Sequence, residues 1–349
     1  GMDSLDPTII MEALKDPVAG IRENAIRLAE LHMSAEPQLT DALFSLQTDP
    51  DAKVRFQLLL TLGFVNTPQS VEARTKLLFA DIDDKWVQIA ALSAGTETSS
   101  LLNEVLARFR PEIPAYSSLV QRLTSMIGIT GGTDNIYPLI EKATNSDEIN
   151  IESNVAILEG LSRGLKNRKS PLQISPNLQK RLVRTFFENN SSQIRNASYH
   201  VLKVGGISEE SLKEQSIEKA LLIIKDTIHK AERRAEAIDF LSLGHPSSYI
   251  SILEKLLVPQ EASIVQLAAV STLNLVPDIS VSQYIIRQWP ELTPEIRDAA
   301  IETFLGKPER VNLLLTAMEK DLILPNSVSF YSSVGLMMQT DKKLRNRAR

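Results

Sequence analysis

The chain contains no cysteine, and this absence removes several kinds of chemistry at once. Disulfide bonds, zinc–thiolate sites, thiol catalysis and covalent haem attachment all require cysteine, so none of them can occur within these 349 residues. The absence does not identify a compartment, although it is compatible with an oxidising one.

The chain also lacks an excess of basic residues and any long apolar run. Its 38 lysine and arginine residues are outnumbered by 43 aspartate and glutamate residues, which leaves a formal net charge of −5. Because a general nucleic-acid-binding protein normally carries a basic face, we expect no nucleic-acid partner. The longest apolar runs, such as ALLII at 220–224, fall well short of the roughly 18 residues that a membrane span needs. The composition therefore indicates a folded chain without a membrane span.

Apolar residues recur at helical spacing through almost the whole sequence. One example is Leu39, Ala42, Leu43 and Leu46, at positions i, i+3, i+4 and i+7. No sustained alternating pattern indicates a strand. The 17 prolines are spread along the chain, and proline is tolerated in the first turn of a helix but disrupts its interior. We therefore expect an all-α protein in which prolines mark helix starts and links.

A local pattern repeats along this helical sequence. Arg22, Arg55 and Gln88 follow one another at intervals of 33 residues, each preceded by an acidic stretch and an Ile or Val. Further copies of the pattern centre on Arg195, Arg234, Gln266 and Arg297, whereas around Arg122 and Glu152 the register is degenerate. An Asp, Asn or Ser before the second helix of each copy can cap that helix. We expect the following arginine to reach an acidic group of the adjacent repeat.

This pattern resembles HEAT repeats, and the resemblance covers nearly all of the chain. It implies an α-α superhelix, that is, a HEAT/armadillo-like solenoid of about nine or ten helix pairs. We expect residues 1–349 to form a single solenoid with a longer irregular loop near 166–177. Such arrays leave extended exposed surfaces that bind other molecules, but the scaffold by itself does not identify a function.

The C-terminal segment carries a narrower resemblance. LLLTAMEK at 313–320 leads to ILP at 323–325 and then to DKKLRNRA at 341–348. This order is similar to the end of the HEAT region in large haem-binding CxxCH proteins of planctomycete and Bacteroidetes type, often labelled membrane-bound dehydrogenases. Residues 14–25 and Thr130-Gly131-Gly132 also resemble that region. In that family a β-propeller usually precedes the HEAT array and a c-type haem domain follows it.

The resemblance implies a non-catalytic spacer or protein-interaction scaffold within a larger exported, periplasmic haem-containing oxidoreductase. Residues 307–349 would then lead to a missing following domain that holds the c-type haem, and the partners would be the flanking domains or another protein. This chain has neither CxxCH nor a propeller, so no cofactor, haem ligand or catalytic residue is carried over to it. The alternatives are a free-standing cytoplasmic HEAT adaptor and, less favoured, a HEAT-like enzyme that handles nucleic acid or a tetrapyrrole.

Two groups of residues are candidates for an interaction surface. Arg163, Lys166, Arg168 and Lys169 form a basic patch beside the predicted long loop, where they could bind an acidic partner or simply complete a solvated helix end. Trp86 stands just before the repeat's Val position. It could anchor a partner on a concave solenoid surface, or it could pack in the core or within a loop.

Two other features are better explained by structure than by chemistry. The run GITGGTD at 128–134 lacks the Lys-Ser/Thr ending of a phosphate loop, so we expect a left-handed glycine C-cap followed by capping from Thr133 or Asp134. The chain's four histidines show no metal-binding spacing, and we expect surface or helix-end positions for them: His32, His200, His229 and His245.

Overall fold

The computed structural model describes residues 6–93, 97–145 and 150–348. Over these ranges the chain forms 21 α-helices and no β-strand, which confirms the all-α prediction. Contacts divide the chain into two compact units, Gly1–Leu172 and Gln173–Arg349. The division falls in the predicted long loop, which runs from the end of one helix at Lys166 to the start of the next at Pro176.

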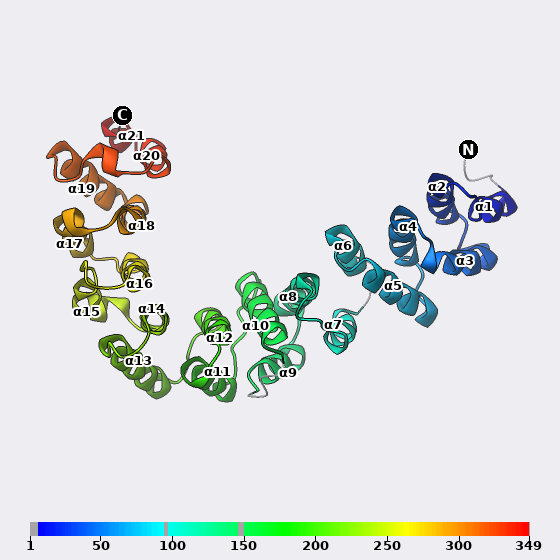
Figure 1. The fold of residues 1–349 in the computed structure, drawn as a ribbon, viewed down its shortest axis with the longest axis horizontal. Helices are drawn as coiled ribbons and strands as arrows, with labels where there is room; N and C mark the ends of the chain where they lie inside the picture. Colours follow the sequence, from blue (N-terminus) through cyan, green and yellow to red (C-terminus); the bar gives the residue numbers. More distant parts are fainter. Residues whose placement is uncertain (1–5, 94–96, 146–149, 349) are drawn as a thin grey trace. The chain divides into compact units, whose positions relative to one another are not determined.

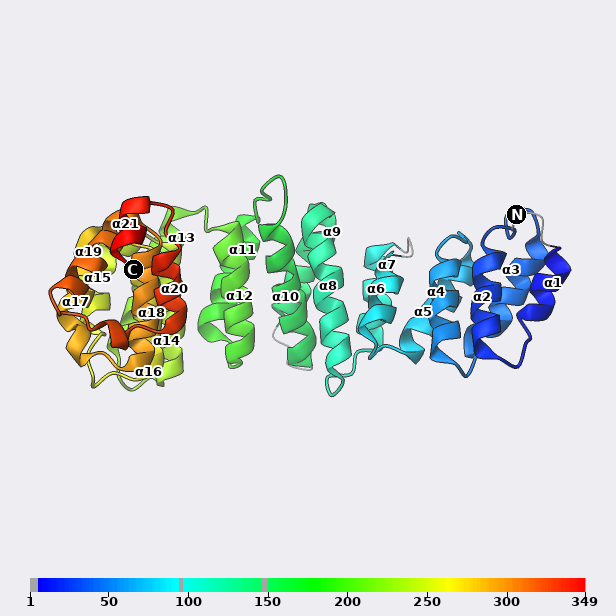
Figure 2. The same cartoon turned by 90° about the horizontal axis from the view of Figure 1, so that it is seen from above.

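Unit 1 consists of five helix pairs in two layers (Figures 1 and 2). The first helices of the pairs are α1 (Pro7–Ala13), α3 (Pro37–Phe44), α5 (Pro68–Ala80), α7 (Thr98–Ala107) and α9 (Thr133–Ala143). The second helices are α2 (Ala19–Ala29), α4 (Ala52–Leu62), α6 (Lys85–Ser93), α8 (Pro114–Thr130) and α10 (Ile151–Lys166). Within unit 1, neighbouring second helices pack against one another, so their apolar faces are buried by neighbouring repeats.

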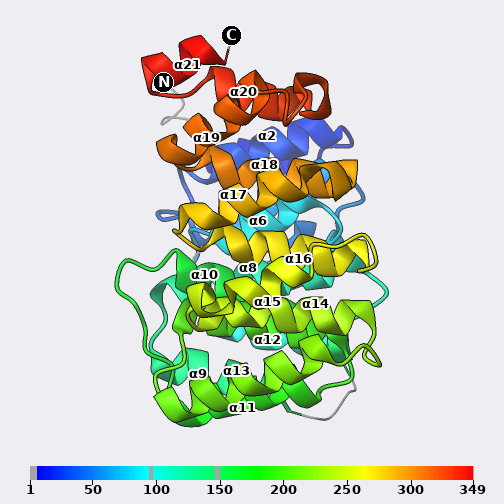
Figure 3. The same ribbon diagram turned by 90° about the vertical axis from the view of Figure 1, so that its left-hand side faces the viewer.

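Unit 2 repeats this arrangement with five more pairs, whose helices lie roughly parallel in a stack in Figure 3. The first helices are α11 (Pro176–Glu188), α13 (Glu210–Lys225), α15 (Ile250–Lys255), α17 (Ile279–Gln288) and α19 (Pro308–Glu319). The second helices, which we call the second-helix layer, are α12 (Ser192–Gly205), α14 (Ala231–Phe240), α16 (Ser263–Asn274), α18 (Pro294–Leu305) and α20 (Phe330–Met337). The short α21 (Lys342–Arg347) packs on α19 and α20.

Many helices begin with the residue types that the sequence predicted there, namely proline in the first turn or a capping Asp or Ser. Seven helices carry proline in the first turn: α1, α3, α5, α8, α11, α18 and α19. Asp51 caps α4 by accepting from the backbone N–H groups of Lys53 and Val54, and Ser191 caps α12. Pro138 is an exception, because it lies inside α9 and does not mark a boundary. It falls in the second turn of α9, where it removes one backbone donor without ending the helix.

The prediction for the glycine run at 128–134 was wrong. Gly128 is buried within α8, and Gly131 ends that helix in an extended conformation, with φ −69° and ψ 153°, instead of the left-handed one. Thr133 and Asp134 lie inside α9, and no side chain caps the N-terminus of that helix. Gly128 serves packing, because a Cβ there would lie 2.9 Å from Gly164 Cα on α10.

Candidate interaction surfaces

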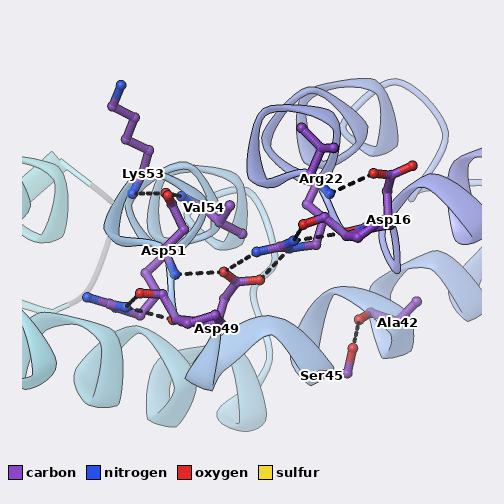
Figure 4. Close-up of polar contacts among 12 residues, drawn as sticks. Asp16, Arg22, Ala42, Ser45, Asp49, Asp51, Lys53 and Val54 are labelled. Atoms are coloured by element: carbon purple, nitrogen blue, oxygen red, sulfur yellow. Dashed lines mark hydrogen bonds and ion pairs between the residues drawn. The ribbon is translucent and has the colours of Figure 1, made fainter.

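A ladder of arginine and aspartate links successive repeats of unit 1 (Figure 4). The guanidinium of Arg22 on α2 donates from Nε and Nη2 to the carboxylate of Asp49, at 2.7 and 2.8 Å. Arg55 on α4 repeats this bidentate contact with Asp81, at 2.7 and 2.6 Å. For Arg22 and Arg55, the prediction that the repeat arginine reaches an acidic group of the adjacent repeat is therefore confirmed, whereas Arg297 on α18 donates to the backbone carbonyls of Trp289 and Pro290.

The ladder also explains the six-residue step between the acidic residue and the arginine. Nη1 of Arg22 donates to the carbonyl of Asp16, six residues earlier, at 2.8 Å, and Nη1 of Arg55 donates to that of Asp49 at 2.6 Å. Asp49 therefore receives one arginine on its carboxylate and the next on its carbonyl. A single residue thus joins two consecutive repeats.

Asp49 is the most deeply buried acid of the ladder. Its side chain is 3% exposed, and that of Arg22 is 12% exposed. Burial alone would raise the pKa of Asp49, but the guanidinium of Arg22 and the backbone N–H of Asp51 outweigh burial and hold that pKa below its ordinary value. The carboxylate is therefore charged and committed to the scaffold, which leaves it unavailable for a ligand.

The ladder continues in altered form outside the first repeats. In α6 the equivalent Gln88 donates to the carbonyls of Ile82 and Ala115, at 2.9 and 3.2 Å, so an amide replaces the ion pair.

In unit 2, Arg195 on α12 makes its bidentate contact with Glu236, which lies on α14 itself, at 2.7 and 2.8 Å. Arg234 pairs with Glu261 at 2.7 Å.

The ladder is interrupted in α8 and α10, where the register was degenerate. The fourth residue of the helix, which is Arg22 in α2 and Arg55 in α4, is Ser117 in α8 and Asn154 in α10. Neither residue carries a charge for an ion pair.

The predicted basic patch is only partly available to a partner. Arg163, Lys166 and Lys169 are exposed, whereas Arg168 is half-buried and donates to the carbonyls of Gly128 and Gly131, at 3.1 and 2.7 Å. The carbonyl of Gly128 belongs to the last turn of α8 and that of Gly131 to its C-cap, where backbone acceptors lack helical partners and a cation is stabilised. Arg168 therefore helps to fasten the long loop to α8.

The predicted aromatic position is exposed but lies apart from the basic patch. Trp86 is 66% exposed at the second position of α6. Second helices of unit 1 run parallel, because Gln88 near the start of α6 reaches Ala115 near the start of α8. Trp86 lies at the start of α6, whereas the basic patch lies in the last turn of α10 and just beyond it, so they lie at opposite edges of the layer. The structure does not bring them into one site.

A cavity that the sequence did not suggest opens on the second-helix layer of unit 2. It has a volume of about 520 Å³ and lies among α12, α14 and α16. We call it the α14 cavity, and its lining is Ser192, Asn196, Tyr199, His200, Glu232, Ala235, Glu236, Asp239, Ile264, Leu267, Ala268 and Ser271. The three acidic residues all come from α14, at spacing i, i+4 and i+7, so they lie along one face of that helix. This spacing was visible in the sequence, but only the packing of three helices shows that the face borders a cavity.

Asp239 differs electrostatically from the other acids of the α14 cavity. Burial raises the pKa of Asp239 to about 6, the charge of Glu236 adds to that rise, and Lys203 and His200 oppose it. Glu236 itself is paired with both Arg195 and Arg233. Asp239 has no ion pair in the described part of the chain.

A second cavity, of about 670 Å³, lies in unit 1 between the α5–α6 and α7–α8 turns. Its lining includes Asp81, which already binds Arg55, together with Asp83, Arg108 and Arg110. The guanidinium of Arg108 stacks over the ring of Phe79, with its Cζ 4.5 Å from the ring centroid. Because charges of both signs line this cavity, it does not favour a ligand of one charge.

No group of three or more His, Cys, Asp or Glu side chains in the described ranges is arranged to hold a metal ion. None of the described helices combines the length and apolar character needed to cross a membrane.

Neither a protein-family model nor a curated protein sequence matches this chain. Solved structures do resemble it. Kap121p bound to Nup53p and Kap121p bound to Ste12p each align with 99% of this chain, with a TM-score of 0.52 and 11% identity. Kap121p bound to Pho4p aligns with the same share, with a TM-score of 0.51 and 11% identity. The chain spans 45% of the length of each of these structures, and at such identity the likeness concerns the fold alone. The fold of this chain is a HEAT/armadillo-type α-solenoid.

Proposed function

We propose that this protein is a non-catalytic interaction scaffold and that a protein partner binds on the second-helix layer of unit 2. The observation that carries this proposal is the α14 cavity, where three consecutive repeats contribute side chains to one hollow. The ladder residues Arg195 and Arg234 on the same helices form ion pairs between repeats. The remaining exposed positions of α12, α14 and α16 are thus held at fixed spacing, which is the property that a binding surface needs.

The solved structures support the class of function at the level of fold. These are structures of Kap121p bound to the proteins Pho4p, Nup53p and Ste12p, so a solenoid of this type accommodates protein partners. The identity of 11% transfers no binding residue to this chain.

From the C-terminal resemblance we also propose that this chain is part of a larger exported, periplasmic haem-containing protein. The partners in that proposal include flanking domains of the same polypeptide. The genomic reading frame tests this proposal directly. A downstream CxxCH with an upstream signal peptide and propeller would support it, whereas a reading frame limited to this length would contradict it.

Site-specific photocrosslinking tests the scaffold proposal. A photoreactive amino acid placed at Ser271, which is exposed on α16 and lines the α14 cavity, would report partners on the second-helix layer. The same group at Leu222, which is 68% exposed on the first helix α13, is the matched control. In cells that naturally make the protein, we expect a discrete crosslinked protein from position 271 and none from position 222. Equal crosslinking from both positions, or none from position 271, would contradict the proposal.

A further inference from the structure

The walls of the α14 cavity differ in character, and the difference limits what the cavity can receive. On the α16 side, Ile264, Leu267 and Ala268 are apolar, and none of the lining residues of that helix is ionisable. On the α14 side lie Glu232, Glu236 and Asp239. An occupant that matches both walls has an aliphatic portion and a positively charged end, as lysine and arginine side chains do.

The three acids are not equivalent as counter-ions for such an occupant. Glu236 already receives two guanidinium groups, from Arg195 at 2.7 Å and Arg233 at 2.8 Å. Glu232 is exposed, so water screens its charge. Asp239 is half-buried and has no ion pair in the described ranges, so an incoming cation would gain most from its carboxylate.

We propose that the α14 cavity receives a lysine or arginine side chain carried by a protein partner, with Asp239 as the counter-ion. The inference rests on the proposed scaffold function and specifies the chemistry of the partner. The apolar wall of α16 covers the aliphatic stem, and the carboxylate of Asp239 accepts hydrogen bonds from the charged end. The raised pKa of Asp239 agrees with this assignment, because the nearby cations do not offset the effect of burial on the carboxyl group in the unbound protein.

Nuclear magnetic resonance with small probes tests the inference. The probes are the N-acetyl, N-methylamide derivatives of lysine and arginine, and the matched control is the same derivative of norleucine, which is uncharged. At neutral pH, each cationic probe at millimolar concentration should shift the amide signals of Leu267 and Ser271, and saturation should lower the pKa of Asp239 by about one unit. Equal shifts with norleucine, or no shift with either cationic probe, would overturn the inference.

The Asp239→Asn variant separates the role of the charge from that of the cavity shape. We expect at least a tenfold loss of affinity for the cationic probes, whereas Glu218→Gln, which removes an exposed acid on α13, should leave affinity unchanged. Retained affinity in Asp239→Asn would contradict the assignment of the counter-ion. The pKa of Asp239 is raised in the folded state, so ionisation of this carboxyl group lowers the stability of the fold as pH rises from about 4 to about 6. Replacing it by a neutral residue removes that cost, and misfolding would therefore not explain a loss of affinity. The asparagine variant should therefore be at least as stable as the natural protein at pH 7, as thermal unfolding would show.

The pH dependence of binding gives a further check. Affinity should fall as pH decreases through about 6, because Asp239 becomes protonated. The other charged groups around it are Lys203 and His200 on α12, and Glu236 and Glu232 on α14. Because His200 also lines the cavity, the decrease must persist in His200→Gln if Asp239 is responsible. Loss of the pH dependence in that variant would count against Asp239.

The outcomes also separate this inference from the scaffold function. A partner captured from position 271 together with absent probe binding would retain the scaffold and reject the cationic side chain. Binding of the cationic probes without a captured partner would retain the cation-binding cavity and reject the scaffold function.

Discussion

At the scale of single residues, Asp49 shows how one side chain holds two repeats together. Its carboxylate receives Arg22 of the preceding repeat, and its carbonyl receives Arg55 of its own repeat. The same carboxylate accepts the backbone N–H of Asp51 at 2.9 Å. Removing the charge would therefore leave a largely buried guanidinium without its counter-ion.

We expect Asp49→Asn to reduce the stability of the α2–α4 region by about 3 kcal/mol near neutral pH. Because the folded-state pKa of Asp49 lies below its ordinary value, the charge contributes fully above about pH 4, the pKa of an unfolded aspartate, and its contribution is lost as pH falls further. Native-state hydrogen exchange of the α4 amides at pH 5–7 would measure the loss.

The more exposed pair of Arg27 and Glu23, whose side chains are 54% and 22% exposed, is the control for this prediction. Glu23→Gln should change stability by no more than about 0.5 kcal/mol. Similar effects of the two substitutions would mean that burial of the Asp49 pair adds nothing.

At the scale of helices, α8 and α10 approach unusually closely because glycine lies on their contact face. A Cβ at Gly160 would overlap Thr124 Oγ1 and lie 2.5 Å from the carbonyl oxygen of Gln121. A Cβ at Gly164 would overlap the carbonyl of Ser125. Apart from Thr124 Oγ1, these contacts are with backbone, which cannot move aside cheaply, so these glycines determine the separation of the two helices.

Gly160→Ala should therefore destabilise unit 1 by about 3 kcal/mol, despite the higher helix propensity of alanine. The comparison is Gly20→Ala on α2, where an added Cβ meets nothing within 4 Å. That substitution should stabilise the protein by about 0.5–1 kcal/mol. Urea unfolding of the two variants would give effects of opposite sign, and a stabilising Gly160→Ala would contradict the close packing.

The pair Gly160 and Gly164 was present in the sequence at helical spacing, yet its meaning could not be predicted there. Glycine lowers helix propensity wherever it occurs. The packing benefit of a glycine depends on which helix lies against it, and here the facing residues are about 36 positions earlier, in α8. By contrast, the arginine ladder was predictable, because its acceptors recur at the repeat interval itself.

At the scale of the whole molecule, stability should be distributed locally. Unit 2 contains an aromatic cluster in which the ring of Phe186 lies 5.0 Å from that of Phe187 and 4.6 Å from that of Phe240, between centroids. These residues come from α11 and α14, so the cluster joins neighbouring repeats. In a repeat array, each pair of helices is stabilised mainly by its neighbours.

Phe186→Ala should cost about 3–5 kcal/mol because it leaves a cavity at a fully buried position. Hydrogen exchange should become faster in α11, α12 and α14 but remain unchanged in α4 and α6. Gly160→Ala should give the reciprocal pattern, with faster exchange in α8 and α10. A uniform increase along the chain in either variant would show that the array unfolds as one cooperative unit.

The sequence by itself determined the helical class, the repeat and the expectation that the repeat arginines reach an acidic group of the adjacent repeat, because all three depend on residues at a regular short interval. It also indicated where the long loop lies. Only the tertiary structure decided that Arg168 is bound to the end of α8, that Trp86 lies apart from the basic patch, and that Asp239 borders a cavity. The physical reason is that exposure, and with it the pKa of a carboxyl group, depends on side chains from several helices, whereas helix formation and repeat pairing depend largely on local pattern.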